Sequence, residues 1–172
     1  MCTFYFPESI VFVRFSLEPD QGDDREMKAK TMPGHLIRRL HQVSTQVFAQ
    51  YMQEAGLKLT PVQFAAMDAI ATYPGIDQAG VAARIAYDRA TIGGVIDRLE
   101  QKGYVSREVS KQDRRAREVR LTDNGQRLYN DILPVVTRLQ EDILPGLSES
   151  ERTQFMELAR KAIGSDQDIT PP

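Results

Sequence analysis

Residues 89–125 read RATIGGVIDRLEQKGYVSREVSKQDRRAREVRLTDNG, and this stretch decides the fold that we predict. Its first part, up to residue 102, has apolar residues at helical spacing, and Gly103 follows as a C-terminal cap. Its second part contains two β-prone runs, residues 104–109 and 117–122, with a polar segment between them. The stretch therefore predicts a helix that is followed by a β-hairpin.

The residues before this stretch predict a second short helix. Asp77 is a suitable N-cap for a helix over residues 78–85, and Asp88 is a suitable N-cap for the helix over residues 89–102. Only residues 86 and 87 remain between the first helix and the cap Asp88, which is enough for a tight turn. Two short helices joined in this way form a helix-turn-helix pattern, and the hairpin that follows would be its wing.

Longer helices flank this unit. Residues 35–55 carry apolar side chains at helical spacing, and a capping box at residues 60–63 begins the next helix. Residues 123–144 predict a long helix that Pro134 kinks or breaks. A second capping box at residues 148–151 opens a last helix. The flanking helices carry more apolar surface than one small winged helix can cover, so we expect a symmetric homodimer.

The predicted fold is thus mainly α with a small β-hairpin wing, a winged helix-turn-helix flanked by N- and C-terminal dimerisation helices. We assign this domain to residues 34–164, with the lobe at 57–122 and the dimerisation helices at 34–56 and 123–164. Residues 1–33 have a β-prone apolar start and then a polar stretch, which indicates a loosely attached extension or an upstream start codon; a strand-forming arm is the alternative. Residues 165–172 are expected to form a loose tail.

The composition excludes several classes of protein. The chain has 172 residues, of which 41% are hydrophobic and 27% charged, as in ordinary globular domains. No apolar run approaches the ~20 residues that span a bilayer, and the N-terminal residues lack the basic region and cleavage site of a signal peptide. We therefore expect a cytoplasmic protein without a membrane partner.

Few residues are available for metal or covalent chemistry. Cys2 is the only cysteine, which excludes an internal disulfide, and His35 and His41 are too few for a typical Cys/His zinc site. Ligation by histidine and carboxylates remains an alternative. No nucleophile elbow, phosphate loop or metal-ligand spacing is present. We expect neither a cofactor nor a metal, and no enzyme activity.

The charge of the chain is unevenly distributed. The net charge is -2, yet residues 84–120 hold ten Lys and Arg against six Asp and Glu. Five of these bases lie between residues 111 and 120. A basic segment within an otherwise acidic chain indicates that this segment binds an anionic partner, and argues against non-specific binding by the whole protein.

The order of the elements resembles the MarR family of transcriptional regulators over about residues 34–164. The family's wing pattern is Asp-x-Arg, five residues, then Leu-Thr, and Asp113, Arg115, Leu121 and Thr122 fit it. The resemblance implies a bacterial repressor that binds a pseudo-palindromic double-stranded DNA operator as a homodimer. Half-sites should lie about one helical turn apart. The alternative is a winged-helix module for protein interaction that does not read DNA.

The resemblance also implies which wing residues contact DNA. Arg115 would enter the minor groove, where the negative potential attracts an arginine, and Asp113 would hold its direction. Lys111, Arg114 and Arg117 are expected to contact phosphates on either side. A solvated hairpin with internal ion pairs is the competing interpretation.

The predicted recognition helix supplies further DNA contacts. Arg89 is placed to read guanine, and Thr91 either contacts a thymine methyl or phosphate or acts as a local cap partner. Arg98 contacts a phosphate or pairs with neighbouring acids at 97 and 100, and Arg84 is a weaker phosphate candidate. Gly93-Gly94 is unusual within a helix and indicates either close approach to DNA or tight packing against the preceding helix.

A ligand is also implied, because members of the family commonly bind small aromatic acids or phenols, which releases the DNA. On the first helix, Arg38 and Arg39 can supply a carboxylate clamp and His41 can bond a carboxylate or ring heteroatom. The alternatives are ordinary surface arginines and a core or interface histidine. Residues 35–52 also look similar to repressors of nicotinate and aromatic-acid catabolism.

Overall fold

The computed structural model describes residues 28–109 and 117–164. In chain order, its elements are η1 (Lys28–Thr31), α1 (Pro33–Glu54), α2 (Pro61–Thr72), α3 (Gln78–Arg84), α4 (Arg89–Gln101), β1 (Val105–Val109), β2 (Arg117–Leu121), α5 (Asp123–Ile143) and α6 (Glu149–Ile163). The mainly α fold with a two-stranded wing is therefore confirmed. Most of the predicted 1–33 extension and the 165–172 tail lie outside the described residues.

The predicted caps begin the helices as expected. Thr60 and Gln63 form a complete capping box at α2. The side chain of Asp77 accepts a hydrogen bond from the backbone N–H of Gly80 at 2.7 Å, and Ser148 and Glu151 form the second capping box at α6. These short-range bonds satisfy N–H groups that a helix start leaves without partners.

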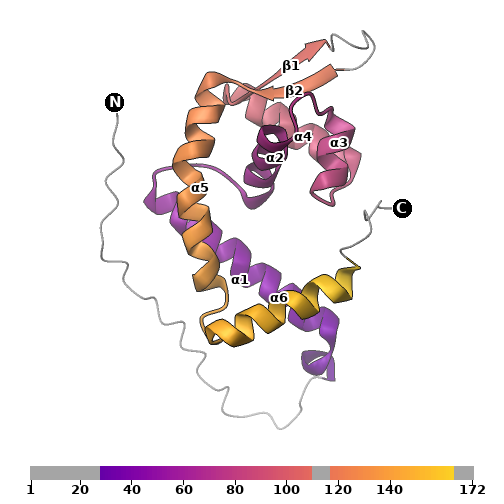
Figure 1. Cartoon of the computed structure of the whole chain (residues 1–172), viewed down its shortest axis with the longest axis vertical. Helices are drawn as coiled ribbons and strands as arrows, with labels where there is room; N and C mark the ends of the chain where they lie inside the picture. Colours follow the sequence, from indigo (N-terminus) through magenta and orange to yellow (C-terminus); the bar gives the residue numbers. More distant parts are fainter. Residues whose placement is uncertain (1–27, 110–116, 165–172) are drawn as a thin grey trace.

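The helix-turn-helix and the wing form one lobe. The turn between α3 and α4 passes through Ala86, whose φ of 54° is left-handed. Strands β1 and β2 pair antiparallel, with Val105 opposite Leu121 and Val109 opposite Arg117. In Figure 1 this hairpin lies at one end of the molecule, next to α2, α3 and α4. The two short helices and the hairpin thus occur in the order that the sequence pattern predicted.

The long helix α5 connects this lobe to α1 and α6 (Figure 1). It starts at the wing, packs against α1 and α2, and continues unbroken through Pro134. The local break that was one of the expected alternatives at this proline is therefore wrong. One hydrophobic core joins both parts of the chain. Its largest fully buried side chains are those of Met52, Met67, Ile92, Ile96, Leu99 and Leu139.

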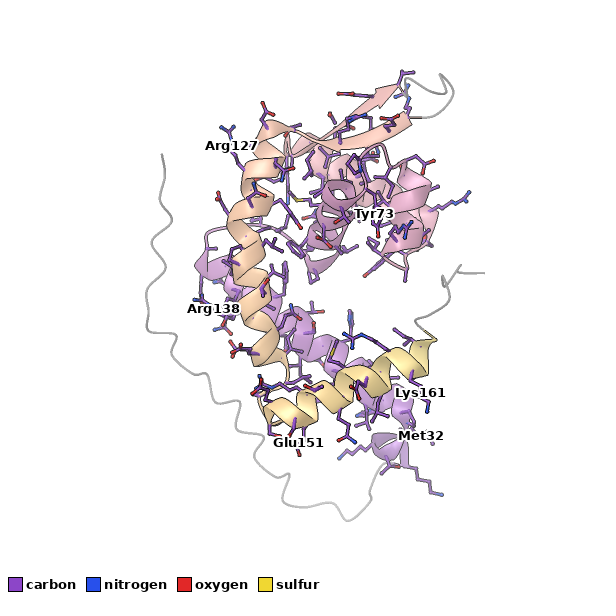
Figure 2. The ribbon with its side chains drawn as sticks, viewed as in Figure 1. Met32, Tyr73, Arg127, Arg138, Glu151 and Lys161 are labelled. Carbon is purple, nitrogen blue, oxygen red and sulfur yellow. The ribbon has the colours of Figure 1, made fainter. Side chains whose placement is uncertain are left out.

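Apolar side chains remain exposed at the far end from the wing. They lie on or beside the N-terminal half of α1 and on α6, and include Met32 (55% exposed), Leu36 (52%), Ile37 (66%), Leu158 (58%) and Ile163 (61%). Figure 2 shows Met32 and Lys161 at this end of the molecule. Large apolar side chains this exposed would be covered if a partner packed against this end of the molecule. No described helix is long and apolar enough to cross a membrane.

Two tyrosine hydroxyl groups form hydrogen bonds that link α5 to α1 and α2. The Tyr51 hydroxyl on α1 donates to the carboxylate of Asp142 on α5. The Tyr129 hydroxyl on α5 donates to Asp68 on α2 at 2.6 Å, and its ring stacks on Phe64 at 6.0 Å between centroids. Burial and the Asp142 bond raise the pKa of Tyr51 to about 12. The bond to Asp68 and then burial raise the pKa of Tyr129 to about 12.

These shifts predict a loss of stability at high pH. A pKa raised above its unfolded value of about 10 favours the neutral phenol in the folded state, so both tyrosines stabilise the fold below pH ~10 and cease to do so as pH rises to about 12. An ultraviolet titration of tyrosinate should show a late step that shrinks in Tyr51→Phe and in Tyr129→Phe. If all tyrosines of the folded protein ionised near pH 10, the two tethers would be contradicted.

Candidate DNA-binding surface

The N-terminal end of α4 is organised by its cap. Asp88 accepts hydrogen bonds from the backbone N–H of Thr91 at 2.8 Å and from its hydroxyl at 2.5 Å. These bonds lower the pKa of Asp88, so its carboxylate stays charged at the positive end of the helix. Thr91 is therefore a local cap partner, which was one of the two roles expected for it. Its side chain remains exposed.

One face of α4 is buried and the opposite face is open. As predicted, the buried side chains are Ile92, Val95, Ile96 and Leu99. Arg89, Ala90 and Arg98 are exposed. Arg89 and Arg98 form no ion pair with any residue that the structure describes. Their guanidinium groups are thus available to an anionic partner.

Arg107 on β1 joins the wing to the recognition helix. Its guanidinium contacts Asp97 at 2.5 Å and also Glu100, both on α4, and donates to the Gln78 side chain on α3 at 3.4 Å. Burial alone would lower the pKa of Arg107, but the hydrogen bonds to the two carboxylates outweigh it and raise that pKa. One side chain therefore fixes three elements relative to one another.

This cluster decides between the two interpretations of Arg98. Asp97 and Glu100 are paired with Arg107, so neither is the partner of Arg98. The expected local pairing of Arg98 with these acids is wrong, and the phosphate contact remains as a prediction. Sequence reasoning missed Arg107. The alternation along β1 carried a signal, because Arg107 shares a strand face with buried Val105 and therefore points toward α4.

The base of the wing contains a second ion pair. Glu108 and Glu118 lie directly opposite one another across the hairpin, and Arg120 contacts Glu118 at 2.5 Å and Glu108 at 3.4 Å. The arginine offsets the repulsion of the two acids. Arg117, at the start of β2, is exposed. Four further predicted wing contacts lie outside the described residues: Lys111, Asp113, Arg114 and Arg115.

The hairpin is also held by the backbone of the lobe. The N–H of Val119 donates to the carbonyl of Ile76 at 2.8 Å, and Asp77 bridges Glu118 as an isolated antiparallel pair. The wing therefore projects from a fixed base.

The remaining predicted residues lie in two other places. Arg84, at the C-terminal end of α3, has its guanidinium 4.3 Å from the centroid of the exposed Tyr73 ring, a cation–π arrangement. Arg38, Arg39 and His41 lie within about one turn of α1, and all three are exposed. They lie in the helical part of the molecule rather than in the winged lobe.

Known proteins similar to this chain are regulators of transcription. The MarR family model matches residues 59–116. The HTH-type transcriptional repressor NicR of Pseudomonas putida is 33% identical over 134 residues, which are 78% of this chain and 84% of NicR.

Two solved structures are similar over 83% of this chain and 99% of their own length, each at 30% identity. One is BpsR of Bordetella bronchiseptica, whose DNA binding is regulated by 6-hydroxynicotinic acid, with a TM-score of 0.74. The other is the PcaV transcriptional regulator of Streptomyces coelicolor in complex with its natural ligand, with a TM-score of 0.72.

Proposed function

This chain belongs to the MarR family, and from that premise we propose that it is a transcriptional repressor that binds a pseudo-palindromic operator as a homodimer. The observation that carries the proposal is the open face of α4, where Arg89 and Arg98 are exposed and without ion pairs to the described residues. N-terminal residues of such a helix meet base edges in the major groove. Because Arg107 ties α4 to β1, the helix and the wing would meet DNA as one unit.

The wing supplies the second part of the proposed interface. Arg115 enters the flanking minor groove with Asp113 directing it, while Lys111, Arg114 and Arg117 contact phosphates. Exposed Arg117 at the rim of the hairpin is consistent with this assignment. Residues 57–122 are then the DNA-binding lobe.

Dimerisation explains the exposed apolar end of the molecule. A second copy would cover the surface on α1 and α6 that includes Leu36, Ile37 and Leu158. Residues 34–56 and 123–164 would therefore form the dimer, and two-fold symmetry would place two recognition helices in successive major grooves. A protein with this partner works in the cytoplasm, and nothing in the proposed role requires catalysis.

The effector that we propose is a small aromatic carboxylate or a phenol. Support comes from BpsR and its 6-hydroxynicotinic acid. On this chain, the exposed guanidinium groups of Arg38 and Arg39 can each form a bidentate pair with a carboxylate. His41 adds a ring nitrogen on the same stretch of α1. Binding would shift the distance between the two recognition helices and release the operator.

The test is footprinting on the DNA immediately upstream of the protein's own gene, with Arg115→Ala beside the wild type. We expect protection of a palindrome, and an operator dissociation constant about tenfold or more higher in Arg115→Ala, since one specific arginine contact is worth about 1–3 kcal/mol. Lys30→Ala, in the exposed η1, removes a positive charge outside both the lobe and the proposed dimer helices and should bind as the wild type does.

Two results would count against the proposal. If fragments selected from the whole genome showed no preferred sequence with a folded, dimeric protein, direct DNA reading would fail and a protein-interaction module would replace it. If Arg115→Ala bound its operator as tightly as the wild type does, the assignment of the wing would fail.

The proposed effector is tested on the complex of the protein with its operator. 6-Hydroxynicotinic acid and other aromatic acids are the first compounds to test for release of the DNA, with Arg38→Ala, Arg39→Ala and His41→Ala as the matching variants.

A further inference from the structure

Two adjacent glycines interrupt the middle of α4, where glycine is the least favourable residue apart from proline. A Cβ on Gly93 would lie 3.2 Å from the Nε2 of Gln78 on α3. A side chain at position 93 would therefore crowd Gln78, which would have to shift by a few tenths of an ångström. A Cβ on Gly94 would meet nothing within 4 Å, so packing within the chain does not account for it.

Gly94 occupies the centre of the open face. With about 100° of rotation per residue, it lies nearly opposite the buried side formed by Ile92, Val95, Ile96 and Leu99. Ala90 is one turn earlier on the same line and is exposed. Over its first two turns, α4 thus presents a strip, Ala90 and Gly94, on which no side chain is longer than a methyl group.

Charged groups stand on both sides of this strip. Arg98 is one turn after Gly94 and is exposed, without an ion pair to the described residues. On the other side, Asp97 is held away from the strip by its 2.5 Å contact with Arg107 on β1. The strip is consequently flanked by an exposed arginine, which has no ion-pair partner among the described residues, and by an acid whose charge Arg107 offsets.

We propose that Gly94 is a specificity-determining residue, at which the bare backbone of α4 lies against the base-pair edges on the floor of the major groove. The inference rests on the proposed function. A long side chain at position 90 or 94 would hold the helix farther from the bases. Arg89 would then be too far from a guanine edge to form its hydrogen bonds. The absence of a side chain lets the helix sit deeper, with Ala90 placed to contact a thymine methyl group.

The proposal predicts opposite effects of one methyl group on folding and on binding. Gly94→Ala should raise the thermal midpoint by roughly 2–4 °C, because alanine favours the helix and meets open space. The same change should raise the operator dissociation constant about tenfold, since overfilling a close-packed contact is unfavourable. Affinity for a random-sequence duplex, which depends on phosphate contacts, should stay unchanged.

Gly34→Ala is the matched control. Gly34 lies in the first turn of α1, and a Cβ there also meets nothing within 4 Å. This variant controls for helix propensity alone and should not lower the thermal midpoint. Because Gly34 belongs to the proposed dimer helices, its operator affinity serves as a reference only where the variant is still a dimer. Light scattering of both variants at the assay concentration checks that each is still a dimer.

The outcomes separate the two proposals. If the wild type binds its operator and Gly94→Ala binds it equally well, the close approach is wrong while the repressor function stands. A parallel loss on operator and random DNA would also overturn the role in specificity. If the wild type itself selects no DNA sequence, it is the proposed function that fails.

Discussion

Gly125→Ala is expected to destabilise the protein by about 3 kcal/mol or more, a loss typical of severe overpacking. A Cβ on Gly125 would lie 1.9 Å from the carbonyl oxygen of Tyr104 and 2.8 Å from its carbonyl carbon. Both atoms belong to the backbone, so no side-chain rotation relieves the clash. For a chain of this length the thermal midpoint should fall by roughly 6–12 °C, which calorimetry or circular dichroism measures directly.

The surroundings of Gly125 explain why the clash cannot be avoided by a small shift. The Tyr104 carbonyl accepts a hydrogen bond from the N–H of Thr122 at 3.0 Å. The Thr122 hydroxyl donates to the Gly103 carbonyl at 2.6 Å and accepts from the N–H of Gly125 at 3.0 Å. The end of α4, the start of β1 and the start of α5 therefore meet at one point, and moving any of them breaks a cap.

Gly94→Ala is the control for this experiment, because it makes the same chemical change inside a helix but into open space. One variant should lose stability and the other should gain it. A Gly125→Ala protein that melted at the wild-type temperature would show that the junction of α4, β1 and α5 yields more easily than its hydrogen bonds indicate.

The features that sequence predicted well are those decided by neighbours in the chain. The Thr60 and Gln63 capping box needs only residues three apart, and both of its bonds form. The hairpin strands also occur where the β-prone runs placed them, because alternation and turn residues act locally. Helical spacing likewise identified the buried side of α4.

Contacts between distant segments were beyond the sequence pattern. Nothing local shows that Gly125 lies against Tyr104, twenty-one positions earlier, or that Arg107 takes both acids that Arg98 was expected to share. The tether from Tyr51 to Asp142 spans 91 positions. Such pairs depend on how helices pack, and one sequence carries no information on packing partners beyond the choice of apolar faces.

Some residues of the candidate site could be predicted from local periodicity, and others rest on the family resemblance alone. The open face of α4 follows from periodicity together with the buried core, so Arg89 and Arg98 were named correctly as exposed groups. The expected DNA contact at Arg115 rests on the family's wing pattern, and the residue lies outside the described part of the chain. The effector residues on α1 also stay predictions, because the structure shows only that their side chains are exposed.

Operator binding should weaken steeply with salt, by about 10³-fold or more between about 50 and about 200 mM, if the dimer releases counterions from six or more phosphates. The net charge of the chain is -2, so general attraction to DNA is weak and the dependence must come from the basic segment 84–120. In this segment, Arg107 and Arg120 are engaged in ion pairs. Among the residues of this segment that the structure describes, Arg84, Arg89, Arg98 and Arg117 are exposed and remain for phosphates or bases. The wing bases Lys111, Arg114 and Arg115 lie outside the described residues and would add to them.

The slope of log affinity against log salt then identifies the phosphate contacts one at a time. Arg98→Ala should reduce the slope by about 1 for each subunit and weaken operator and random DNA alike, because a phosphate contact carries no sequence information. Lys30→Ala, at an exposed lysine of η1 outside the proposed lobe and dimer helices, should leave the slope unchanged. Sequence-specific binding that persisted without any salt dependence would contradict the assignment of these arginines to the DNA backbone, since neutralising a phosphate always releases its counterion. The dimer would then hold its operator by base contacts and shape alone.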